Sequence, residues 1–115
     1  MSEYEELRID LDRGFSVDNL RSITNHAIEI LRQNVPRHPA IPLIIAILSR
    51  WIADSWDEKA LSVDVANRVE SQIKPHFQKL LSLADSDAAE VYAAVNETAL
   101  AFSAAICSGL DSDLI

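Results

Sequence analysis

The sequence predicts an all-α fold, a four-helix bundle-like domain with a central apolar helix. The stretch from about 41 to 56, IPLIIAILSRWIADSW, is apolar at nearly every position and is interrupted by few charges. Only two glycines occur, Gly14 and Gly109, whereas a β-rich domain of 115 residues would need more of them in its turns. Apolar residues make up 49% and charged residues 24% of the chain, which is typical of a folded protein.

We expect three parts in one domain's length of chain. They are an N-terminal arm over 1–15, a helical domain over 16–109 and an acidic C-terminal tail over 110–115. The first helix of the domain starts after Ser16, whose hydroxyl suits an N-cap, and it ends near Asn34 because Pro36 disfavours a helical residue before it. Its core side is predicted from residues at helical spacing, which are Leu20, Ile23, Ala27, Ile30 and Leu31.

The second helix is predicted to start between Pro39 and Pro42, after a stiff proline-rich turn, and to run to about Trp56. Each fully buried aliphatic side chain contributes about 1.5–3 kcal/mol, so a helix of this composition cannot face water. Either the rest of the chain or a second copy must cover it. Arg50 and Asp54, four residues apart, are expected on a water-facing edge, and Trp51 is expected to seal the end of the bundle together with Trp56.

The third helix begins at Ser62 and ends near Leu83, with Pro75 expected to kink it. Its core positions are Val65, Val69, Ile73, Phe77 and Leu80.

The fourth helix follows the cap Asp85-Ser86-Asp87 and runs to about Ser108, with Gly109 as its stop. Its core positions are predicted to be Val91, Val95, Ala99, Phe102 and Ile106. A second, small-residue side that admits close approach of another helix is formed by Ala94, Ala101, Ala104 and Ser108.

Residues 4–12 in the arm fit two conformations. Leu7, Ile9 and Leu11 alternate with charged residues, which is a strand pattern. Tyr4, Leu7 and Leu11 also have helical spacing, and Gly14 could end a helix. Nothing else in the chain alternates, so a strand here would have to pair with the same segment of a second copy. The sequence leaves strand and helix both open.

The charge is strongly negative and uneven. The net charge is −8, with six acidic and two basic residues in 1–18 and six acidic and no basic residues in 85–115. Phosphate binding needs clustered lysine and arginine, so nucleic acid is an unlikely partner on this pattern, whereas a basic protein partner is compatible with it. The 62–83 helix, for example, carries only Arg68, Lys74 and Lys79 as bases beside two acids.

A cytoplasmic location is predicted. The single cysteine, Cys107, excludes an internal disulfide and favours a reducing compartment. The acidic start MSEYEELRID lacks the pattern of a secretory signal. A membrane span needs about 20 apolar residues, and the 41–56 stretch is shorter and contains Arg50 and Asp54.

Candidate catalytic and metal-binding residues are weak. His26 and Glu29 lie one turn apart, but a metal site needs three or four converging ligands. Asp10-x-Asp12-x-Gly14 lacks the later glutamate of a calcium loop. Cys107 has no base nearby in the sequence and is expected to be an inert thiol. We therefore assign no catalytic residue, no metal site and no cofactor.

The sequence favours a non-catalytic helical protein-interaction module, such as an adaptor, a regulator or an inhibitor of the immunity type, acting as a homodimer. The alternative is a bundle that binds a small ligand or cofactor. Its pocket would lie near the Pro75 kink and be lined by Phe77, Trp51 or Trp56.

Overall fold

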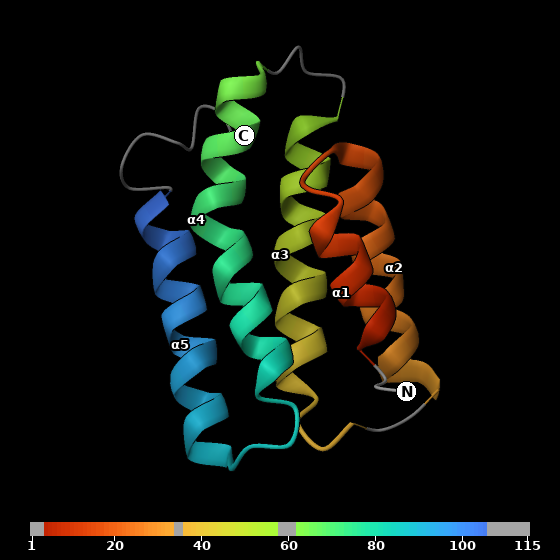
Figure 1. The fold of residues 1–115 in the computed structure, drawn as a ribbon, viewed down its shortest axis with the longest axis vertical. Coiled ribbons are helices and arrows are strands. Elements are labelled where there is room, and N and C mark those ends of the chain that lie inside the picture. The colour runs from red at the N-terminus through yellow and green to blue at the C-terminus, as the bar shows by residue number, and fades with distance from the viewer. Residues whose placement is uncertain (1–3, 34–35, 58–61, 106–115) are drawn as a thin grey trace.

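The fold is all-helical in the computed structural model, which describes residues 4–33, 36–57 and 62–105. Cys107 and the rest of 106–115, including the predicted helix end at Ser108–Gly109 and the acidic tail, lie outside the described residues. The described chain forms five helices (Figure 1), which are α1 (Glu5–Asp12), α2 (Val17–Gln33), α3 (Ala40–Trp56), α4 (Val63–Ser82) and α5 (Ala88–Ala105).

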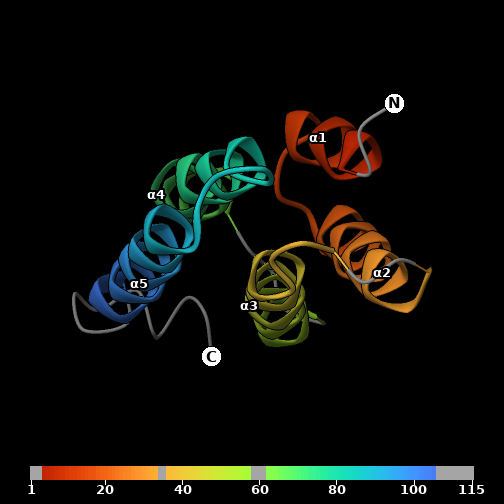
Figure 2. The same ribbon diagram turned by 90° about the horizontal axis from the view of Figure 1, so that it is seen from below.

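Successive helices run in opposite directions (Figure 1), as short connections between neighbouring helices favour. Seen along the helices, α1 and α2 lie on one side and α4 and α5 on the other (Figure 2). The α3 helix lies between α2 and α5, and none of the described helices covers its outer side (Figure 2). This placement decides which of its residues the chain can bury.

The predicted helix starts are confirmed by capping hydrogen bonds. The Ser16 hydroxyl accepts from the Asn19 amide at 3.1 Å, and the Ser62 hydroxyl accepts from the Val65 amide at 3.2 Å. Asp87 does the same for α5 by accepting from the Glu90 amide. Each cap satisfies one of the amides that a helix leaves unpaired in its first turn. The α4 helix continues through Pro75 to Ser82.

The arm is a helix over the residues whose conformation the sequence left open. Tyr4, Leu7 and Leu11 are buried, so the helical spacing, and not the alternation, describes this segment. An eight-residue helix is too short to be stable alone in water, and its packing against the core supplies the missing stability. The strand alternative is therefore wrong. The pairing of such a strand with the same segment of a second copy is wrong for the same reason.

The connection between α1 and α2 is held against α4. Gly14 has a φ of +91°, in the left-handed region that glycine adopts without strain. The amide of the next residue, Phe15, donates to Glu70 Oε1 of α4 at 2.7 Å. A Cβ atom added at Gly14 would lie 2.9 Å from the same oxygen. The turn therefore requires glycine both for its backbone angle and for space.

The core runs along the inner side of α3. Ile41, Ile45 and Ile52 are fully buried, and Trp56 is buried at the end of the bundle as predicted. They pack in one cluster with the predicted stripe of α4, in which Val69, Ile73, Phe77 and Leu80 are buried. The α2 residues Leu20, Ile23 and Ala27 complete it.

A polar contact is buried between α2 and α3. The hydroxyls of Thr24 and Ser49 lie 2.9 Å apart, and each also donates to or contacts a carbonyl oxygen of its own helix. Because a buried hydroxyl without a partner is costly, this contact favours one register of α2 against α3.

The described residues do not enclose α3 on all sides, and this differs from the prediction of a fully central helix. Leu43 and Ile47 are exposed, and Trp51, which was expected to seal the bundle, is 40% exposed. The reason is geometric: α3 is apolar around most of its circumference, while α2, α4 and α5 reach only its inner side and flanks.

The α5 helix buries Val91 and Phe102 of its predicted stripe and packs Val95 against the core, but it differs from the prediction at Ala99. Ala94 and Thr98 are buried with Val91 and Phe102, whereas Ala99 is exposed. The prediction placed Ala99 in the core stripe and Ala94 on the second, small-residue side that another helix can approach. Alanine is accepted at buried and exposed helix positions alike, so an alanine-rich helix gives a weak signal for its rotation.

Gly14→Ala is expected to lower the free energy of unfolding by about 1–2 kcal/mol, because alanine is strained at positive φ and its Cβ crowds Glu70. Urea unfolding followed by circular dichroism measures this change. In a Glu70→Ala background the same substitution should cost less, since the crowding oxygen is gone. Equal stability of Gly14→Ala and wild type would contradict this account of the turn.

Candidate interaction surface

Three large apolar side chains lie exposed along the outer side of α3. Leu43, Ile47 and Trp51 are 49%, 55% and 40% exposed. They are spaced four residues apart, so they form a single stripe along the helix. Isolated exposed apolar side chains are normal on a protein surface, whereas a contiguous row of them is a candidate for an interaction surface.

The stripe continues onto α5. The rings of Trp51 and Phe102 pack with centroids 4.6 Å apart and planes inclined by 51°. Nearer the start of α5, Tyr92 is 78% exposed and Val95 is partly buried against the core. We call Leu43, Ile47, Trp51, Tyr92 and Val95 the α3/α5 face.

A shallow hollow of about 280 Å³ lies between the starts of α3 and α5. Its lining is Arg37, His38, Pro39, Ala40, Ala88, Val91, Tyr92 and Val95. Two contacts hold the two sides of the hollow together. Arg37 Nη1 donates to the Asp85 carbonyl at 2.9 Å, and His38 Nε2 lies 2.6 Å from the Ser86 carbonyl oxygen. The turn before α3 is thereby tied to the turn before α5, and the hollow is held in shape before anything binds.

The charges on the edge of the α3/α5 face nearest α2 are paired with one another. On this edge, Asp54 accepts from Arg21 at 3.0 Å and lies 3.7 Å from Arg50, which confirms the predicted edge of Arg50 and Asp54. Arg21 also contacts Asp57 at 3.1 Å. Its hydrogen bond to Asp54, with the charge of both carboxylates, raises the pKa of Arg21 above its usual value. This edge of the face is therefore balanced in charge, whereas Arg37 brings a positive charge to the hollow at the other end.

A polar cluster joins α1 to α2 on another side of the molecule. The Asp10 carboxylate is buried, and it accepts from the Ser22 hydroxyl at 3.1 Å and contacts His26 Nδ1. The other ring nitrogen of His26 lies 3.3 Å from Glu6 Oε2. The sequence paired His26 with Glu29 and missed these contacts, although a helical arm places Glu6 and Asp10 one turn apart.

This cluster has the geometry of a structural clamp. The Ser22 hydroxyl donates to the Asp10 carboxylate, and His26 contacts the same carboxylate oxygen, so one acceptor on α1 holds two side chains of α2. Glu6 and Asp10 approach opposite nitrogens of the His26 ring, so the three groups do not converge on one point. Across the described residues, no group of three or more His, Cys, Asp and Glu side chains is arranged to hold a metal ion.

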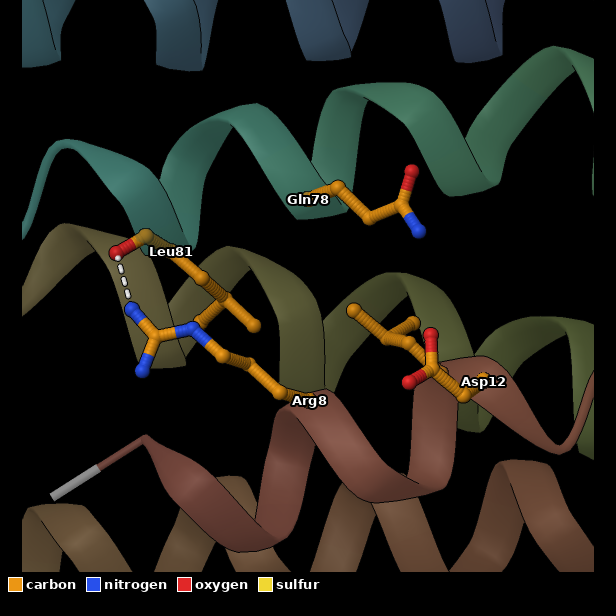
Figure 3. A pocket seen from close by; sticks show the side chains of 5 residues that line it. Arg8, Asp12, Gln78 and Leu81 are labelled. Atoms are coloured by element: carbon orange, nitrogen blue, oxygen red, sulfur yellow. Dashed lines mark hydrogen bonds between the residues drawn. The ribbon is translucent and has the colours of Figure 1, made fainter. Parts of the chain in front are cut away.

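A cleft of about 240 Å³ separates α1 from α4 (Figure 3). Arg8, Leu11 and Asp12 line it from α1, and Gln78 and Leu81 line it from α4. Arg8 Nη2 donates to the Leu81 carbonyl oxygen at 3.2 Å. Carbonyls in the last turn of a helix lack a partner within the helix, so Arg8 satisfies one of them and fastens α1 to the end of α4.

The small-ligand pocket predicted near Pro75 is not among these hollows. Phe77 and Trp56, two of its expected lining residues, are buried within the core cluster, and Trp51 lies on the α3/α5 face. A third hollow, of about 240 Å³, is lined by Arg21, Thr24, Asn25, Ile28, Arg50 and Asp54. All three are smaller than the 300–1,000 Å³ that is typical of ligand sites.

Comparisons of the chain with protein-family models, with curated proteins and with solved structures give no match. Within the described residues, none of the helices combines the length and the apolar character needed to cross a membrane.

Asp10→Ala is expected to destabilise the fold by about 1–3 kcal/mol, because Ser22 and His26 lose their shared acceptor. Asp12→Ala is the matched control, since it removes the same charge from an exposed position two residues away. It should change the free energy of unfolding by no more than about 0.5 kcal/mol. Urea unfolding of both variants measures the difference, and equal losses would show that Asp10 is not the clamp.

Proposed function

We propose that this chain is a non-catalytic protein-interaction module that binds another polypeptide through the α3/α5 face. The supporting observation is the row formed by Leu43, Ile47 and Trp51 on the most apolar helix of the domain. At about 25 cal/mol per Å² of apolar surface removed from water, covering this row is a substantial driving force for association. An adaptor, a regulator or an inhibitor of the immunity type, acting in the cytoplasm, fits this description.

Apolar contact, and not charge, is the main attraction that this face offers. The charges on its edge nearest α2, which are Arg21, Arg50, Asp54 and Asp57, neutralise one another. The surplus negative charge lies elsewhere on the chain, where it would speed the approach of a basic protein without holding that protein at the α3/α5 face.

Catalysis is not part of the proposal. Across the described residues, no buried side-chain nitrogen or oxygen is left without a hydrogen-bond partner. The polar cluster around Asp10 joins α1 to α2.

A second candidate is a binder of a very small polar molecule in the α1/α4 cleft. Arg8 and Asp12 both line this cleft and bring opposite charges to it (Figure 3), which suits a small zwitterion such as a free amino acid. The size of the cleft limits the ligand to a few non-hydrogen atoms. Binding would raise the melting temperature of wild type with increasing amino acid and would not do so in an Asp12→Asn variant.

Site-specific crosslinking tests the main proposal. A photoreactive amino acid at position 47, on the α3/α5 face, is expected to give a covalent adduct with a polypeptide in cells that express the protein. The matched control is position 9 on α1, where Ile9 is also exposed, at 45% against 55% for Ile47. Equal labelling from both positions, or none from position 47, would contradict the proposal.

A further inference from the structure

We infer that the occupant of the α3/α5 face is the same face of a second copy of this chain. The inference rests on the proposed function and names its partner. In such a two-fold assembly each contact occurs twice, so Leu43, Ile47 and Trp51 are covered in both chains at once. The apolar side of α3 that the described helices leave exposed is then buried.

The charge distribution selects this surface for contact between two acidic chains. At a net charge of −8, two copies repel each other wherever acidic residues meet. The α3/α5 face avoids this, because Asp54 is paired with Arg21 and Arg50 at its rim. On α5, Glu97 pairs with Lys79 of α4 at 3.0 Å, and this pair lies on the flank away from α3.

A basic protein partner would find little electrostatic attraction at the same surface. Such a partner binds through unpaired carboxylates, and the carboxylates closest to Ile47 and Trp51 are already neutralised within the chain. An apolar surface with an edge of balanced charge is complementary to another of its own kind.

The size of the face sets the expected affinity. A helix of 17 residues, as α3 is, has a length of about 25 Å, and neighbouring helices lie about 8–10 Å apart. A surface over α3 and α5 therefore covers on the order of 500 Å² per chain, or about 1,000 Å² in a dimer. This is at the lower limit for a specific interface, so we expect a reversible dimer with a dissociation constant in the micromolar range.

The α5 side of the α3/α5 face also allows a second copy to approach closely. Tyr92 and Val95 line the hollow, and Ala99, four residues after Val95 on α5, is exposed and small. The hollow is held by Arg37 and His38 on carbonyls of the opposite turn, so little order has to be gained on binding.

Sedimentation equilibrium of the purified chain tests the inference with two matched variants. Ile47→Glu places a charge in the centre of the face, and Ile9→Glu places the same charge on α1, outside it. A glutamate at position 47 gains Arg50 within one turn, whereas a glutamate at position 9 gains Arg13 but also lies within one turn of Glu5, Glu6 and Asp12, so the folding of each variant is measured separately. Circular dichroism and melting temperature provide this measurement for each.

We expect wild type to dimerise in the micromolar range. Ile47→Glu should weaken the dimer at least about tenfold, and Ile9→Glu should leave it within about twofold. Dimerisation that both variants weaken equally would overturn the assignment to the α3/α5 face, and a wild type that stays monomeric up to about millimolar concentration would overturn the dimer itself.

The two proposals fail in different ways. A monomeric wild type whose position 47 crosslinks to a different protein overturns self-association and supports the interaction module. A monomeric wild type with no crosslink from position 47 overturns both.

Discussion

The structure depends on how the α3 helix divides its apolar surface. Ile41, Ile45 and Ile52 point into the core and organise the packing of α2 and α4 around them. Because a helix has a circumference that three neighbours on one side cannot cover, Leu43 and Ile47 remain outside. One helix thus supplies both the core of the domain and its candidate interaction surface, and the fold and the proposed function have a common physical origin.

The other contacts hold this arrangement in place. The Thr24–Ser49 contact favours one register of α2 against α3, and the Glu70 carboxylate holds the turn at Phe15 against α4. Asp10 with its partners clamps α1, which is too short to be stable by itself, onto α2. None of these polar groups borders the α3/α5 face. Stability and binding therefore use different surfaces of the molecule, so a change in one need not change the other.

Much of the fold could be predicted from local sequence signals. Caps at Ser16 and Ser62 and the apolar stripe of α4 fix where helices begin and which side they bury, because these signals act within one or two turns. On α5 the burial of Ala99 was predicted wrongly, since alanine carries little information about burial. For α1, eight residues are too few to separate alternation from helical spacing, and only the docking of Tyr4, Leu7 and Leu11 onto the core decides between them.

The candidate surface could be predicted only in part. The composition of α3 indicates that something must cover it, but which side stays exposed depends on where α5 packs, and this is a long-range property. The same holds for the contact between Asp10 and His26, which are 16 residues apart in the sequence. Trp51 shows the limit most clearly, because a large aromatic residue on an apolar helix suits a core and an interface equally well.

The most direct test of this division is the solvent accessibility of methyl groups on α3, measured by NMR with a soluble paramagnetic agent at low and high protein concentration. The account predicts that Ile45 and Ile52 methyls are protected at every concentration, whereas Leu43 and Ile47 methyls relax rapidly in dilute protein and become protected as the concentration rises. Rapid relaxation of Ile45 and Ile52 in dilute protein, to the same extent as Leu43 and Ile47, would contradict it.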